Sequence, residues 1–117
     1  MKVQKTKISA EVETDTAIIR FLAPTLRDPA EAQKAAQEIE NIAVTHNVNA
    51  VIINFSRLLQ LSSVFLGRLV QLRKTLDTHG IQLRVCGMSA DIEKAFKICK
   101  LDKAIPAFAT EEDATAG

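Results

Sequence analysis

The sequence predicts an α/β fold: a small mixed β-sheet, opened by an antiparallel hairpin and continued by parallel strands, packed with helices. Segments typical of strands and of helices alternate along the chain. A continuous apolar run at 49–55 is typical of a central strand buried on both faces. No repeat, low-complexity tract or linker divides the 117 residues, so we expect a single domain over 1–117.

Two segments typical of strands begin the chain, at residues 2–13 and 16–23. Polar and apolar residues alternate loosely in the first segment, and the second has a β-branched centre. The short polar pair Thr14-Asp15 between them predicts a hairpin. The sheet is therefore expected to open with an antiparallel pair.

A first helix is predicted to begin at Asp28, whose side chain can cap the free N–H groups of the first turn. Pro29 suits the first helical position, and Glu31 stands three residues after the cap. The residues that repeat at helical spacing behind this start, and should face the sheet, are Ala32, Ala35, Ala36, Ile39, Ile42 and Ala43.

A second helix is predicted after the central strand, from about Ser63 to His79, with Gly80 in the usual position after its end. Its inward face at helical spacing is Phe65, Leu66, Leu69, Leu72 and Leu76. Its outward face is Ser63, Val64, Gly67, Gln71, Lys74 and Thr75, with Arg68 at the edge. Because glycine costs about 1 kcal/mol relative to alanine in an exposed helix interior, Gly67 favours a surface that a protein partner approaches closely.

Three further elements complete the predicted order. A strand is expected at 81–87, a third helix capped by Ser89 follows it, and a last short strand is expected at 104–109. The inward stripe of the third helix is Ile92, Ala95, Phe96 and Cys99. Residues 110–117 are expected to form a fraying turn. Strands joined through helices run parallel, with right-handed crossovers.

Composition and charge argue against several classes of protein. The net charge is +1, Trp and Tyr are absent, and basic residues are not clustered, so direct nucleic-acid binding is not expected. No apolar run could span a bilayer, and the first residues lack the apolar core of a signal peptide. Cys86 and Cys99 lack metal-site spacing and are expected to be reduced and buried, as in a cytoplasmic protein. No cofactor or metal is expected.

Residues suited to catalysis are scarce. The two histidines, His46 and His79, fall at the predicted ends of the first and second helices. At the C-terminal end of the second helix, His79 is explained by a favourable interaction with the helix dipole. No P-loop, GxGxxG or Ser/His/Asp pairing is present. Asp91 and Glu93 are explained as acids of a helix start. The protein is therefore not expected to be an enzyme.

The segment from Val51 to Phe108 resembles a STAS domain, the family of the bacterial anti-sigma factor antagonists. VIINFSRLLQLSSVFLGRL (51–69) has the family layout: a buried strand, a short connection, a serine pair at a helix start and a further glycine. GIQLRVCGMSADIEKAFKICKLDKAIPAF (80–108) continues the match through its strand–turn–helix order and its closing LDKAIPAF.

The resemblance implies a protein that binds an anti-sigma factor, itself a serine kinase, with a phosphatase that resets the switch. By position, the phosphoacceptor is Ser62, with Ser63 beside it. The partner-binding residues at and after this helix start are Leu61, Val64, Gly67, Arg68 and Gln71.

Two positions depart from the family pattern, because Leu61 replaces its Asp and Val64 replaces its Gly. These departures favour an alternative, a non-phosphorylated STAS subunit of a stress-signalling or membrane-transport assembly. The serine pair favours the switch, although Ser62 or Ser63 also serves as a plain helix cap. Nucleotide binding is reported for some STAS domains, but this sequence has no cluster of glycines that could hold a phosphate. The sequence does not decide whether the protein forms a homodimer.

Overall fold

Strands and helices alternate along the chain after an opening run of antiparallel strands. The structure, a computed structural model, describes all of residues 1–117. The strands are β1 (Lys2–Gln4), β2 (Ile8–Glu13), β3 (Thr16–Phe21), β4 (Thr25–Leu26), β5 (Ala50–Asn54), β6 (Gln60–Leu61), β7 (Gln82–Cys86) and β8 (Ala107–Phe108). The helices are α1 (Pro29–Thr45), α2 (Ser63–Thr78), α3 (Ala90–Ile98), the 3-10 turn Leu101–Lys103 and α4 (Glu111–Ala116).

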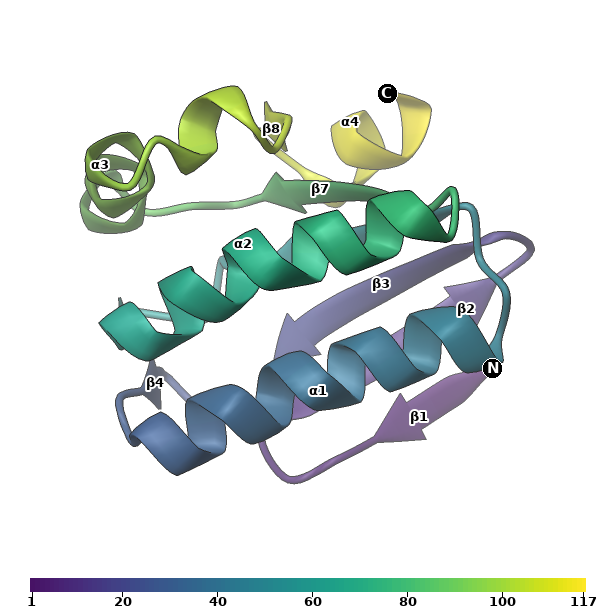
Figure 1. Cartoon of the computed structure of the whole chain (residues 1–117), viewed down its shortest axis with the longest axis horizontal. Coiled ribbons are helices and arrows are strands. Elements are labelled where there is room, and N and C mark those ends of the chain that lie inside the picture. The colour runs from purple at the N-terminus through teal and green to yellow at the C-terminus, as the bar shows by residue number, and fades with distance from the viewer.

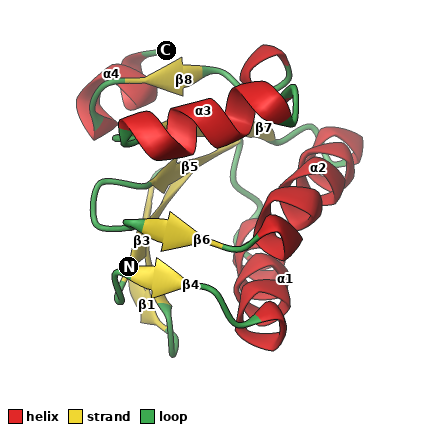
Figure 2. Cartoon of the chain, turned by 90° about the vertical axis from the view of Figure 1, so that its left-hand side faces the viewer, coloured by secondary structure: helices red, strands yellow, loops and turns green.

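The main sheet has six strands in the order β1-β2-β3-β5-β7-β8. The first two neighbouring pairs, β1–β2 and β2–β3, are antiparallel, and all later neighbours are parallel. α1 and α2 lie side by side across one face of this sheet, and α4 lies on the other (Figures 1 and 2). The mixed α/β fold predicted from the sequence is confirmed.

The core between the sheet and the two long helices contains the residues that the helical spacing predicted. Every predicted inward residue of α1 and of α2 is buried. β5 is buried on both faces over Ala50–Ile53, as its apolar run predicted. Four phenylalanines meet at one end of this core, with ring centroids 5.4 Å apart for Phe21 and Phe55, 5.9 Å for Phe21 and Phe65, and 5.8 Å for Phe55 and Phe96.

The predicted first strand, 2–13, is wrong in extent because the chain turns back within it. β1 pairs antiparallel with β2, so that Val3 lies opposite Ala10, and the amide of Lys5 donates to the carbonyl of Ile8 across the turn. Residues 5–7 are polar or charged and include no apolar side chain that would anchor a strand to the core. The hairpin at Thr14-Asp15 is confirmed.

The third helix differs from its predicted stripe at one end. Ile92 and Phe96 are buried and Ala95 is half-buried, but Cys99 is exposed because it caps the end of α3 and lies outside its packed turns. The prediction that both cysteines are buried is therefore wrong for Cys99. Cys86 is buried in β7, and this burial raises the pKa of its thiol to about 11.

The predicted fraying turn at the C-terminus is wrong, because Glu111–Ala116 form α4. Thr110 caps this helix by accepting from the amide of Asp113. Ala114 is fully buried against the second face of the sheet. The Glu111 carboxylate accepts two hydrogen bonds from the Arg20 guanidinium of β3, both at 2.8 Å, and one from the Asn54 amide. The strand predicted at 104–109 is shorter in the structure, because only Ala107–Phe108 pair with β7.

This ion pair is expected to make stability sensitive to acid. Hydrogen bonds from Arg20 hold the pKa of Glu111 below its usual range, so its contribution is complete above the ordinary carboxyl pKa and is lost as pH falls through the lowered value. Glu111→Gln should lower the free energy of unfolding by about 1 kcal/mol at neutral pH, and the difference should vanish in acid. Urea unfolding across pH measures it, with the exposed Glu112→Gln as control. A difference that persists unchanged in acid would contradict this account.

Candidate functional site

The starts of α1, α2 and α3 gather at one end of the molecule, beside the carboxyl ends of β3, β5 and β7 (Figures 1 and 2). The short parallel pair β4–β6, which sequence reasoning missed, joins the connections that lead into α1 and α2. The amide of Leu59 donates to the carbonyl of Pro24 at 2.7 Å, and the amide of Ser62 donates to the carbonyl of Leu26 at 2.8 Å. The start of α2 is thereby held against the segment that precedes α1.

Ser62 is the N-cap of α2, as one of the two sequence interpretations predicted. Its backbone is extended, with φ −85° and ψ 155°, and its Oγ accepts from the amide of Phe65 at 3.2 Å. Phe65 is fully buried, so the cap is anchored to the phenylalanine cluster. Ser62 is half-buried, whereas Ser63, the first residue of the helix, is exposed.

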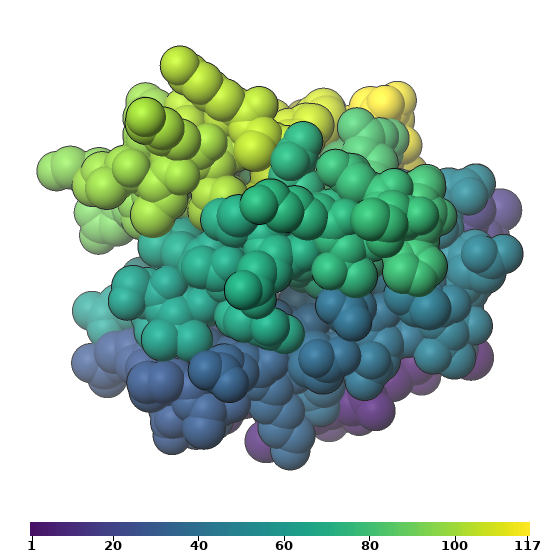
Figure 3. Space-filling model, viewed as in Figure 1, coloured from purple at the N-terminus to yellow at the C-terminus, as the bar shows by residue number.

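The two residues that depart from the family pattern both contribute to packing. Leu61 in β6 and Val64 in the first turn of α2 are half-buried and pack against the main core. The expectation that Val64 faces solvent is therefore wrong in part. α1 lies along one flank of α2, and the side chains of the two helices meet on this face (Figure 3), so the outward face of α2 is narrower than that of a helix packed on a sheet alone.

The remaining predicted partner-binding residues form an open surface on α2. Gly67 is exposed, and a methyl group added there would meet no heavy atom within 4 Å. Gln71 is exposed and accepts a hydrogen bond from the half-buried Arg68 at 2.8 Å. Ser63 and Gly67 therefore present an accessible strip next to the capping serine.

A groove beside this strip includes residues that sequence reasoning missed. It has a volume of about 290 Å³. Its lining comes from the β4 and β6 ends and from the facing turns of α2 and α3: Arg27, Leu59, Gln60, Leu61, Leu66, Asp91, Ile92 and Ala95. Leu59 is 65% exposed at the edge of this groove. The apolar sequence around Leu58–Leu61 was the available signal, but only the β4–β6 pairing places it beside α3.

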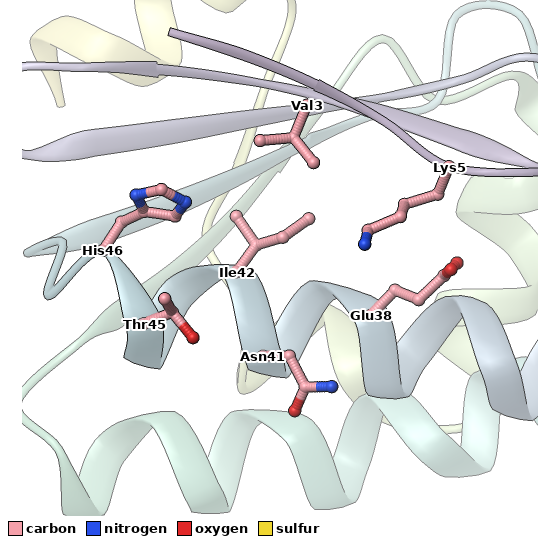
Figure 4. A pocket seen from close by; sticks show the side chains of 7 residues that line it. All are labelled: Val3, Lys5, Glu38, Asn41, Ile42, Thr45 and His46. Carbon is pink, nitrogen blue, oxygen red and sulfur yellow. The ribbon is translucent and has the colours of Figure 1, made fainter.

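A second, smaller cleft lies between β1 and α1, toward the C-terminal end of α1 (Figure 4). Its volume is about 170 Å³, and it is lined by Val3, Lys5, Glu38, Asn41, Ile42, Thr45 and His46. Its ionisable side chains are Lys5, Glu38 and His46. The structure contains no cluster of three or more His, Cys, Asp or Glu side chains arranged to hold a metal ion. None of the helices combines the length and the apolar character needed to cross a bilayer.

Comparisons with known proteins agree with this architecture. A family model described as the STAS domain matches residues 7–114. Among solved structures, the phosphorylated form of the Bacillus cell fate determinant SpoIIAA is 24% identical, with a TM-score of 0.71 over 93% of this chain and 96% of that one. An anti-sigma-factor antagonist (STAS) domain protein from Planctomyces limnophilus is 19% identical, with a TM-score of 0.78 over 95% and 96% of the two chains.

A third solved structure, a sulfate transporter family protein from Wolinella succinogenes, is 14% identical, with a TM-score of 0.71 over 91% of this chain and 86% of that one. At these identities the three structures show a shared fold. A search of curated proteins found no match.

Proposed function

The chain belongs to the STAS-domain family, and from this premise we propose that it is a cytoplasmic signalling protein of the anti-sigma factor antagonist type. In this proposal it acts by binding an anti-sigma factor that is also a serine kinase, not by catalysis. Phosphorylation of Ser62 by that kinase weakens the complex, and a phosphatase restores it.

The observation that carries the proposal is the position of Ser62 beside an accessible helix surface. Ser62 ends the β6 connection and caps α2, and the exposed Ser63 and Gly67 follow on the open strip. The bare backbone at Gly67 allows a partner to approach α2 closely, which explains why a residue unfavourable in a helix interior stands there. Leu61, Val64, Arg68 and Gln71 form the edges of this binding surface.

The location of Ser62 is also compatible with a switch that leaves the fold intact. A phosphoserine carries about −1.5 to −2 charges at neutral pH, and the N-terminus of a helix favours negative charge. The modified domain therefore stays folded, while the partner surface gains charge and bulk. Binding falls through repulsion and through the cost of desolvating the phosphate.

The alternative is a STAS subunit that binds constitutively. The packing of Leu61 and Val64 against the core favours it, because Leu61 lacks the carboxylate that the family pattern has at this position and Val64 adds bulk where the pattern has glycine. One structural neighbour is described as a sulfate transporter family protein, which supports a transport setting for this alternative. In this alternative the domain serves a stress-signalling or transport assembly, and Ser62 is a cap only.

Mass spectrometry of the intact protein purified from its native host, with mapping of the modified residue, distinguishes the two proposals. A phosphate on Ser62 or Ser63 supports the switch. Absence of phosphate across growth and stress conditions favours the constitutive subunit. Proteins that copurify identify the partner: an anti-sigma factor with kinase activity in the first case, and components of another assembly in the second.

The variant Ser62→Asp is expected to weaken binding to the copurifying partner at least tenfold while changing thermal stability little, because Asp is also a good N-cap. Ser62→Asn caps equally well without charge and should retain binding. Ser62→Ala should cost about 1 kcal/mol of stability through loss of the cap. Calorimetric titration and thermal unfolding measure both effects. Equal affinity of the Asp and Asn variants would refute an electrostatic switch.

Position 67 offers an independent test of the binding surface. Gly67→Gln adds bulk at a point where no neighbouring atom is contacted, so the fold should tolerate it and partner binding should weaken. Unchanged binding would place the partner elsewhere on the molecule, whatever the result at Ser62.

A further inference from the structure

Arg27 is an arginine without a partner in the immediate neighbourhood of Ser62. It follows β4 directly, and Ser62 follows β6 directly. These strands pair in parallel with Leu26 opposite Leu61, so extending the register by one residue places Arg27 opposite Ser62. The contact is close, because the amide of Ser62 donates at 2.8 Å to the carbonyl of Leu26, the group joined to the Arg27 nitrogen.

The guanidinium of Arg27 has no interaction partner within the protein. Arg20, Arg73 and Arg84 each donate to a carboxylate or a carbonyl oxygen. Arg27 is exposed and makes neither an ion pair nor a side-chain hydrogen bond. Two acids that adjoin Arg27 in sequence or share its groove do not pair with it. Asp28 caps α1 by accepting from the amide of Ala30, and Asp91 lines the same groove without forming an ion pair with Arg27.

We propose that Arg27 is the residue that receives the phosphate when Ser62 is phosphorylated. Adjacent strands lie about 4.8 Å apart, well within the reach of an arginine side chain, and a guanidinium donates two parallel hydrogen bonds to phosphate oxygens. Arg27 also lines the groove with Leu59 and Leu61, so turning toward the phosphate removes its charge from that groove. One modification thereby changes both the serine surface and the groove beside it.

This inference rests on the proposed switch at Ser62, and its test does not depend on the native kinase. Phosphoserine is installed at position 62 by translational incorporation, and the phosphate is titrated by ³¹P NMR in the full chain. Arg27→Gln should raise the titration midpoint by a few tenths of a pH unit relative to the phosphorylated protein with Arg27, because an exposed cation is lost. Arg57→Gln, which removes another exposed arginine that forms no ion pair, should leave the midpoint unchanged.

A second measurement uses thermal unfolding in a double-mutant cycle. Phosphorylation should lower the melting temperature more in the Arg27→Gln variant than in the protein with Arg27, and added salt should reduce the difference. An unchanged midpoint together with additive melting temperatures would overturn the role of Arg27. Absence of phosphate from the protein of the native host would instead refute the proposed switch, and the two failures are therefore distinguishable.

Discussion

Replacement of Phe55 with alanine is expected to lower the free energy of unfolding by about 3–5 kcal/mol, the range for a fully buried phenylalanine. Its ring lies between those of Phe21 and Phe96. Phe21 ends the strand that leads into β4, and Phe96 belongs to α3, so the loss loosens the segments that surround the candidate site. Because domains of this size are stable by about 5–15 kcal/mol, the variant should be folded only marginally.

Urea denaturation of the Phe55→Ala and Phe55→Leu variants measures this effect. Leucine refills part of the cavity and should cost clearly less than alanine. Phe108→Ala is the matched control, because Phe108 is half-buried beside the small cluster on the second face of the sheet. Equal losses at Phe55 and Phe108 would contradict a central role for the phenylalanine cluster.

The second large effect is expected at Gly87, where Gly87→Ala should destabilise the fold by about 2–4 kcal/mol. Its φ is +68°, in the left-handed region that L side chains rarely adopt. An added Cβ would also come within 2.8 Å of Asn54 Oδ1 and 3.1 Å of the Ser56 amide nitrogen. Asn54 Oδ1 accepts from that same amide, so the substitution disturbs the turn by which the chain leaves β5.

Two other glycines separate the causes of this loss. Gly80 has φ +71° but open space around its Cβ position, so Gly80→Ala should cost only the conformational part, about 1–2 kcal/mol. Gly67 is helical and unobstructed, so Gly67→Ala should stabilise by about 0.5–1 kcal/mol. Thermal unfolding of the three variants measures the series. A loss at Gly87 no greater than that at Gly80 would exclude the steric contribution.

Local sequence signals predicted α1, α2 and α3 well, because the causes of helix formation are contained in a few neighbouring residues. Asp28 and Ser89 cap α1 and α3 as expected, and the apolar stripe of α1 is buried throughout. The same reasoning identified Ser62 as a cap and Gly67 as an open position on α2. The phosphoacceptor role of Ser62 stays a prediction, since capping geometry is common to modified and unmodified serines.

The wrong predictions concern segments whose structure depends on contacts with residues distant in the sequence. α4 is short and its sequence resembles a fraying end, but it is held by Arg20 from β3 and by the burial of Ala114. A helix of this length is not stable alone, so only packing decides its formation. The split between β1 and β2 likewise depends on pairing across the turn.

The sequence by itself determined which residues of α1 and α2 enter the core, where α1, α2 and α3 begin, and that a capping serine stands before an open helix surface, because periodicity and caps act within one or two turns. Only the tertiary structure decided that β4 pairs with β6, that Arg27 consequently lies beside Ser62, and that a groove separates α2 from α3. The β4–β6 pairing and the groove join segments that are distant in sequence, and no local pattern records which segments will meet.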